Sequence, residues 1–185
     1  MSEPIDPSRN PWTRRSRHTV YENRWIEVVH DEVVRPDGTD GVYGVVRFRD
    51  RAVGVVPVAV DGRILLVGQF RYTLDEYSWE IPEGGVPPEE DPLAGAKREL
   101  VEETGFTAGT WRVLVPRFSL SNSVGDQTGS IYVATELEPG PAAPEPTEEI
   151  ALRWVTLAEG LAMIDAGEID DSVTQVGLLR YAKGP

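Results

Sequence analysis

Three glutamates that fall within one helical turn are the side chains of this sequence best suited to chemistry. Glu99, Glu102 and Glu103 lie in the segment Arg98–Phe106. In a helix, residues three and four apart are neighbours, so these carboxylates are predicted to share one border of the helix. Hard divalent cations such as Mg²⁺ take oxygen ligands of this kind. The spacing therefore indicates either a magnesium site or a solvated charged face, and spacing alone does not distinguish the two.

The charge of the whole chain bears on its partners. The sequence has 31 acidic and 18 basic residues and a formal net charge of −13. Such a chain offers no basic surface for the backbone of a polymeric nucleic acid. The same negative field repels phosphorylated substrates, so an acidic protein that handles phosphates needs cations or a local arginine. Charge thus argues against nucleic-acid polymers as partners and favours a bound metal.

The glutamates belong to a longer pattern of fixed positions. Gly84, Glu90 and Arg98 precede them with five and seven intervening residues, and Gly105 and Phe106 follow. These residues match the Nudix box, G-x5-E-x7-R-E-U-x-E-E-x-G-U with U an apolar residue, at every fixed position of the 23-residue motif. The sequence therefore resembles the Nudix hydrolase family.

A looser resemblance extends from about Thr19 to Tyr181. The segment Gln69–Tyr72 and the closing helices are similar to the ADP-ribose pyrophosphatase, or nucleoside-diphosphate-sugar hydrolase, branch of the family. This resemblance implies an α/β fold, the Nudix α/β/α sandwich with a mixed β-sheet and an N-terminal antiparallel β subdomain. In similar proteins the subdomain builds a two-fold homodimer by exchanging strands.

The resemblance also implies a metal site. Glu99 and Glu103 are the expected principal ligands of Mg²⁺, for which Mn²⁺ is a substitute, and Glu102 assists them. The backbone carbonyl of Glu83 is a further expected ligand, and relatives often have alanine at this position. Gly84 and the glycine after it, Gly85, allow the loop to approach the metal closely.

Other motif residues are expected to be structural. Arg98 can reach Glu102 one turn on, or hold the loop that contains Glu90. Gly105 suits the left-handed position that ends a helix. We expect these residues to support the site rather than to catalyse.

Substrate-binding residues are expected before the motif. By resemblance, Arg71 contacts a substrate phosphate, although a plain surface charge is an equal alternative. Trp79 is a candidate for stacking on a purine and Glu80 for accepting hydrogen bonds from ribose or base. A tryptophan in a strand is more often part of the core, so that reading stays open for Trp79.

The general base is expected in a loop after the motif. The matching loop holds three glutamates, Glu145, Glu148 and Glu149. Glu148 is the first choice, and a solvated loop charge is its alternative. Asp126 competes from another loop. His18 and His30 are expected to be bystanders in N-terminal strands.

Local signals place the elements that position these residues. A helix is predicted over residues 92–104, with Asp91 as its cap, Pro92 in the first turn and Gly105 after its end. Asp61-Gly62 predicts a two-residue type I′ hairpin turn. Strands are predicted around residues 19–21, 25–30, 32–34, 41–46, 53–60, 63–69, 79–82, 111–115, 130–135 and 149–155, a loop over 83–88, and closing helices at 157–166 and 172–182.

Three regions follow from this pattern. Residues 1–16 are predicted to be a flexible arm with structure starting near His18, residues 17–52 the N-terminal β subdomain, and residues 53–185 the Nudix domain. Cysteine is absent, which removes thiolate zinc sites and cysteine nucleophiles. No apolar run reaches the length of a membrane span and no secretory signal is present, so a cytoplasmic protein without a membrane partner is expected.

The expected function is Mg²⁺-dependent hydrolysis of the diphosphate bond of ADP-ribose or a related nucleoside-diphosphate sugar. The products would be a nucleoside monophosphate and a sugar phosphate. Two alternatives stay open: hydrolysis of a nucleoside triphosphate or dinucleoside polyphosphate, and a non-catalytic nucleotide-binding regulatory domain.

Overall fold

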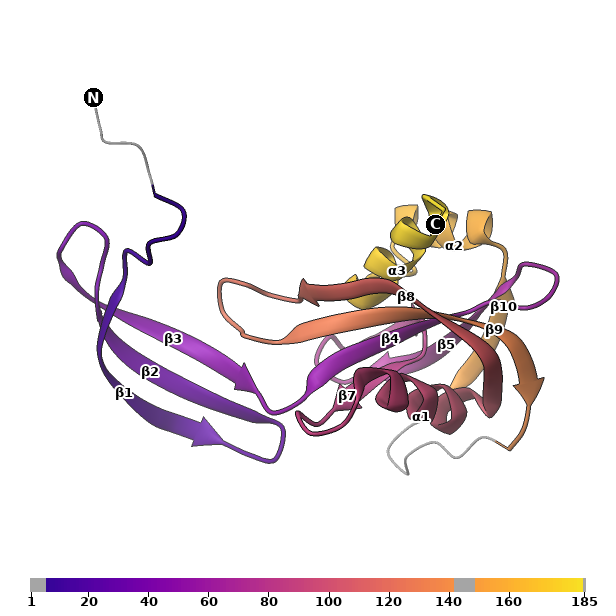
Figure 1. Cartoon of the computed structure of the whole chain (residues 1–185), viewed down its shortest axis with the longest axis horizontal. Coiled ribbons are helices and arrows are strands. Elements are labelled where there is room, and N and C mark those ends of the chain that lie inside the picture. The colour runs from indigo at the N-terminus through magenta and orange to yellow at the C-terminus, as the bar shows by residue number, and fades with distance from the viewer. Residues whose placement is uncertain (1–5, 142–148, 185) are drawn as a thin grey trace. The chain divides into compact units, whose positions relative to one another are not determined.

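The computed structural model describes residues 6–141 and 149–184. The chain forms two compact units, one of the residues up to Arg49 with Ser121–Asp126, the other of Asp50–Leu120 with the residues from Gln127 onward. Elements are labelled as in Figure 1. The second unit starts close to the predicted boundary between residues 52 and 53, whereas nothing in the sequence pattern assigned Ser121–Asp126 to the first unit. In the two described ranges, no helix combines the length and apolarity needed to cross a membrane.

The first unit is the antiparallel sheet expected at the N-terminus. It consists of β1 (Thr13–Glu22), β2 (Ile26–Val34) and β3 (Asp40–Phe48), in the order β1-β2-β3. β1 begins at Thr13, earlier than the start predicted near His18. The Arg17 side chain binds Asp31 of β2 with two hydrogen bonds of 2.7 Å, which fastens this early part of β1 to its neighbour. The exchange of strands between two copies stays a prediction.

The second unit contains two sheets. One has the order β7-β4-β9-β8 and is mixed, since β4 and β9 run parallel and the other pairs antiparallel. The other is antiparallel, with the order β10-β5-β6. The strand bounds are β4 Arg51–Pro57, β5 Ile64–Arg71, β6 Glu76–Glu80, β7 Glu83–Val86, β8 Phe106–Ser119, β9 Thr128–Pro139 and β10 Ala151–Val155.

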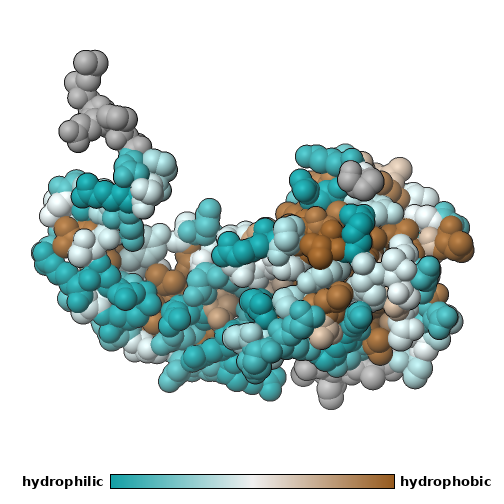
Figure 2. Space-filling model, viewed as in Figure 1, coloured by the Kyte–Doolittle hydropathy of each residue, from teal (hydrophilic) through white to brown (hydrophobic). Residues whose placement is uncertain are grey.

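Helices cover both faces of the mixed sheet. Val55 of β4 packs with Leu100 of α1 (Pro92–Thr104) in one core cluster. Its neighbour Val56 points to the other face and packs with Met163 and Leu178, which belong to α2 (Leu157–Asp165) and α3 (Ser172–Ala182). The predicted α/β/α layering is therefore confirmed (Figure 1). On the face drawn in Figure 2, hydrophilic residues predominate and apolar ones form separate patches.

Local capping signals correctly predict α1. The Asp91 side chain accepts a hydrogen bond from the Ala94 N–H at 3.2 Å. Gly105 ends the helix with a φ of 74°, and its N–H donates to the Val101 carbonyl. Because both signals act within a few residues, the predicted and observed bounds agree.

Two predicted connections differ from the structure. The turn after β4 is not type I′, because Gly62 has a φ of 84° while Asp61 does not adopt a positive φ. The Gly62 N–H donates to the Ala59 carbonyl, which makes a type I turn followed by a left-handed glycine. Beyond the Val58–Ile64 bridge, β4 and β5 enter different sheets.

The second difference concerns residues 83–88, predicted as a loop. They begin with β7, which pairs antiparallel with β4 from Gly54↔Glu83 to Arg51↔Val86. Gly84 and Gly85 have low strand propensity, so the local pattern hid a strand that long-range pairing imposes.

Candidate functional site

The last turn of α1 is joined to β7 at Glu103. Glu103 is only 3% exposed, and its Oε2 accepts a hydrogen bond from the Glu83 N–H at 3.0 Å. A carboxylate this buried requires hydrogen-bond donors of this kind. The bond fixes the backbone at the start of β7 against the end of the helix.

Glu99 lies directly over Gly84. A Cβ at position 84 would overlap the carboxyl carbon and both carboxyl oxygens of Glu99. Only glycine leaves this space, so the carboxylate rests against the backbone of β7 with 12% of its side chain exposed. The two glutamates one turn apart thus approach the same short strand.

Arg98 connects the acidic helix to the loop after β7. Its Nη1 donates to Glu99 Oε1 and to Glu102 Oε2 at 2.8 Å each, and its Nη2 donates to the Gly85 carbonyl at 2.9 Å. Nη2 also lies 3.5 Å from Glu90 Oε2, so Arg98 makes both contacts considered for it. Partial burial opposes its charge, but nearby Glu99 and the bond to Glu102 raise the pKa of Arg98 above its usual value.

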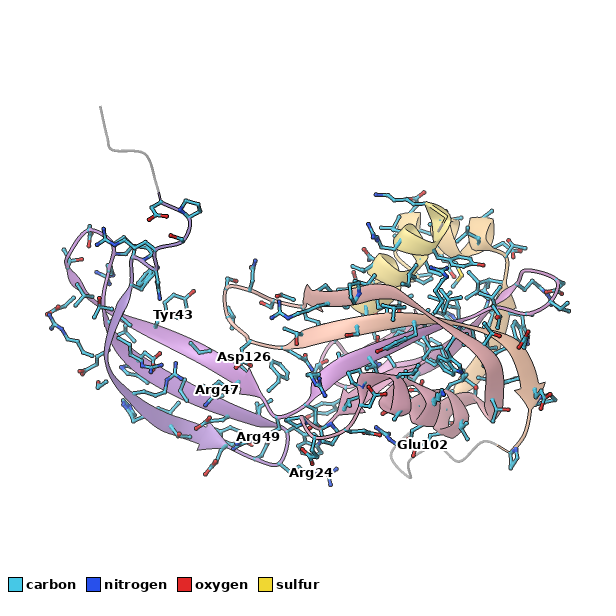
Figure 3. All side chains as sticks on the ribbon, in the orientation of Figure 1. Arg24, Tyr43, Arg47, Arg49, Glu102 and Asp126 are labelled. Atoms are coloured by element: carbon cyan, nitrogen blue, oxygen red, sulfur yellow. The ribbon has the colours of Figure 1, made fainter. Side chains whose placement is uncertain are left out.

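The donor set suits a hard divalent cation, although not as a ready-made cluster. Across residues 6–141 and 149–184, no three Asp, Glu or His side chains converge on a common metal position. Arg98 binds both Glu99 and Glu102, and the Glu102 side chain, labelled in Figure 3, is 37% exposed. Two largely buried carboxylates beside a glycine backbone still fit Mg²⁺, which keeps several waters and needs few protein ligands.

Arg71 and two glutamates form a second charged group beside β7. Arg71 Nε donates to Glu80 Oε1 at 2.8 Å, its Nη2 binds Glu80 Oε2, and the same Nη2 lies 3.4 Å from Glu83 Oε1. The bond to Glu80 raises the pKa of Arg71, so the guanidinium stays charged. The Arg71 side chain is 34% exposed.

The Glu83 side chain lies among more negative than positive charges. Its Oε2 is buried and has no hydrogen-bond partner. Burial raises the pKa of Glu83 well above its usual value, and the charges of Asp171 and Glu80 add to this despite Arg71. Asp171 caps α3 by accepting the Thr174 N–H at 2.6 Å. Asp171 directly precedes the helix predicted at residues 172–182, and no spacing in the sequence relates it to the motif.

Trp79 and Glu80 do not share a face of the sheet. Neighbouring strand residues point to opposite sides, and Glu80 faces Arg71 while Trp79 packs against the core cluster beside α2 and α3. Trp79 also contacts Tyr77 edge to face at 5.7 Å. The structure thus brings together Arg71, Glu80 and Glu83, whereas Trp79 is partly buried against the core cluster, and its stacking on a purine stays a prediction.

The candidates for the general base lie in different parts of the chain. Asp126 accepts the Phe48 N–H at 2.9 Å and lies 3.6 Å from Arg47 Nε, so it serves the edge of β3 (Figure 3). Glu145 and Glu148 lie outside the described residues. Glu149 lines a pocket of about 550 Å³. The other lining residues are Gln69, Phe70, Tyr77, Ile150 and Ala151, so the pocket lies along the strand that ends in Arg71.

Comparisons with known proteins agree with this geometry. Residues 48–175 match the model of the NUDIX domain, and residues 12–46 match that of the nucleoside diphosphate sugar hydrolase N-terminal domain. The chain is 33% identical to the CMP-5'-(N-acetyl-N-hydroxy-3-aminopropyl)phosphonate hydrolase of Streptomyces rubellomurinus, over 91% of this chain and 81% of that one. It is 32% identical to the ADP-ribose pyrophosphatase of Mycobacterium tuberculosis, over 89% and 80%. A crystal structure of an ADP compounds hydrolase shares the fold, with a TM-score of 0.83, 24% identity and 96% of each chain covered.

Proposed function

Because this chain belongs to the Nudix family, we propose that it uses Mg²⁺ to hydrolyse the diphosphate bond of ADP-ribose or a related nucleoside-diphosphate sugar. The products are a nucleoside monophosphate and a sugar phosphate. The chain is a Nudix pyrophosphatase, and members of this family generally use a divalent metal. What remains proposed is the choice of metal, substrate and products.

The arrangement of Glu99, Gly84 and Glu103 supports this proposal most strongly. One carboxylate rests on the β7 backbone through the space that Gly84 leaves, and the other is tied to the same strand by the Glu83 N–H. Glu99 and Glu103 would hold the metal together with the Glu83 carbonyl, and Glu102 would assist from the exposed side. A bound divalent cation neutralises the diphosphate and makes a water more nucleophilic.

Arg71 supplies the cation that an acidic protein needs near a phosphate. It stands at the end of β5, partly exposed and held in place by Glu80. We assign to it the contact with the substrate diphosphate, in partial exchange for its weak contact with Glu83. The pocket along β5 is large enough for a nucleoside, and a nucleoside bound there would lie beside Glu149, which lines it, while Glu80 would act through its contact with Arg71.

A substrate screen with Mg²⁺ tests the proposed reaction. Phosphate released after phosphatase coupling is expected to be highest with ADP-ribose or another nucleoside-diphosphate sugar, and low with ATP and diadenosine polyphosphates. The CMP-phosphonate hydrolase relative makes a cytidylyl conjugate the second candidate, so CDP-linked substrates belong in the panel. Turnover of triphosphates alone, or of nothing in the panel, would reject the proposal.

The general base is tested by glutamine variants of the loop after β9. Glu148→Gln is expected to lower turnover about 10²- to 10⁴-fold, because a proton-abstracting group contributes this much, while the Mg²⁺ midpoint of activity stays unchanged. Turnover is measured against Mg²⁺ concentration for Glu145→Gln, Glu148→Gln and Glu149→Gln. Asp126→Asn serves as the comparison, since that side chain is bound to β3. Wild-type rates in all the glutamate variants would place the base inside the motif.

A further inference from the structure

Arg51, at the start of β4, binds the loop between β7 and α1. Its Nη2 donates to the Glu90 carbonyl at 2.7 Å and to the carbonyls of Pro87 and Pro88 at 3.3 Å each. The residue lies outside the 23-residue motif, and these hydrogen bonds go to backbone carbonyls. A single guanidinium nitrogen therefore binds three backbone carbonyls of one loop.

The loop is held at its other side by Arg98. The Arg98 guanidinium binds the Gly85 carbonyl at 2.9 Å and lies 3.5 Å from the Glu90 carboxylate. Arg51 and Arg98 thus fasten the segment 85–90 from β4 and from α1. Pro87 and Pro88 have no backbone N–H, so this loop can form fewer backbone hydrogen bonds of its own. Its position therefore depends more on the side chains that donate to its carbonyls.

The segment 85–90 continues directly from the backbone on which the proposed metal ligands rest. Gly84, next to its first residue, is the floor beneath the Glu99 carboxylate. Glu83, one residue earlier, holds Glu103 through its N–H. A shift of the segment 85–90 would therefore change the spacing between the β7 backbone and both carboxylates.

We propose that Arg51 is a positioning residue for the metal site. It fixes the segment 85–90, which is the end of β7 and the loop after it, through the carbonyls of Pro87, Pro88 and Glu90. This inference rests on the proposed metal-dependent function. Outer partners of metal ligands typically change metal affinity or activity about 10- to 100-fold when they are removed. Because Arg51 acts on the ligands through the backbone, its removal is expected to lower metal affinity before it lowers turnover at saturating metal.

The contacts of Arg51 also show which substitution should preserve part of its function. Its Nε is buried without a hydrogen-bond partner, so replacing that atom by carbon loses no hydrogen bond. A lysine ammonium has three donors on one nitrogen and can replace Nη2 at a slightly shorter reach. Methionine fills similar space but donates nothing to the carbonyls. Arg51→Met and Arg51→Lys therefore separate the loss of the donor from the loss of side-chain volume.

The experiment compares metal binding in the two variants with the wild type. Mn²⁺ binding is measured by electron paramagnetic resonance without substrate, and turnover of ADP-ribose is titrated with Mg²⁺. Arg51→Met is expected to weaken Mn²⁺ binding and raise the Mg²⁺ midpoint about 10- to 100-fold, with most of the turnover restored by excess Mg²⁺. Arg51→Lys is expected to lie between Arg51→Met and the wild type.

Arg63→Met is the matched control, because Arg63 is partly exposed and pairs with Asp61 at 2.8 Å in the turn after β4. It is expected to leave Mn²⁺ affinity unchanged. Wild-type Mn²⁺ affinity in a folded Arg51→Met protein would overturn the proposal, as would equal Mn²⁺ affinities of folded Arg51→Lys and Arg51→Met. If the methionine variant does not fold, a loss of Mn²⁺ affinity of about 100-fold or more in folded Arg51→Lys would overturn it, because lysine keeps a donor to the carbonyls. A wild type that binds no Mn²⁺ would overturn the proposed function itself, and that failure is visible before any substitution is made.

Discussion

Replacing Glu103 by glutamine is expected to lower turnover on the order of 10²-fold or more while the protein stays folded. The amide has the shape of the carboxylate, and its oxygen can still accept the Glu83 N–H that Glu103 accepts at 3.0 Å. What the substitution removes is a negative charge from a nearly buried position where a metal is proposed. The measurement is turnover at saturating Mg²⁺, with folding followed by circular dichroism.

A second readout separates metal loss from other causes. A ligand that binds only the folded protein raises its unfolding midpoint, so millimolar Mg²⁺ is expected to stabilise the wild type and to have a smaller effect on Glu103→Gln. Glu89→Gln provides the control, because Glu89 is an exposed residue of the same motif at a position without a fixed residue type. Near-normal turnover of Glu103→Gln at saturating Mg²⁺ would contradict the assignment.

The parts of the fold that were predicted correctly depend on neighbours in sequence. α1 begins after Asp91 and ends before Gly105 because each signal satisfies backbone groups within the same turn. β7 depends instead on pairing with β4, whose paired residues lie 29 to 35 positions earlier. Its glycines gave no strand signal, so only the folded sheet reveals that the motif begins in a strand.

The candidate site shows the same division. Glu99 and Glu103 were found through the motif, but their different settings, one over Gly84 and one bound to the Glu83 N–H, arise from the packing of α1 on β7. Arg51 and Asp171 come from elements at opposite ends of the second unit, and no spacing links them to the motif. Strand alternation does predict from the sequence that Trp79 and Glu80 point to opposite faces.

Substituting alanine for Gly84 is expected to weaken metal binding strongly with little effect on the fold. The new Cβ would occupy the place of the Glu99 carboxyl group, which is the far end of a flexible side chain and can turn away. The backbone of residue 84 does not have the positive φ that requires glycine, so alanine is compatible with β7. The substitution is therefore expected to displace the Glu99 side chain and to leave the strand intact.

Loss of a correctly placed ligand shows first as weakened metal binding that excess metal partly restores. Gly84→Ala is therefore expected to raise the Mg²⁺ midpoint of activity on the order of 10- to 100-fold, as for other losses of support at metal sites. Gly44→Ala is the matched control, since a Cβ at that position of β3 meets no atom within 4 Å. If Gly84→Ala keeps the wild-type midpoint, the contact between the β7 backbone and Glu99 has no part in metal binding. A raised midpoint with an unchanged melting temperature in metal-free buffer would instead show that the glycine is required by the metal site, because the fold alone accepts alanine there.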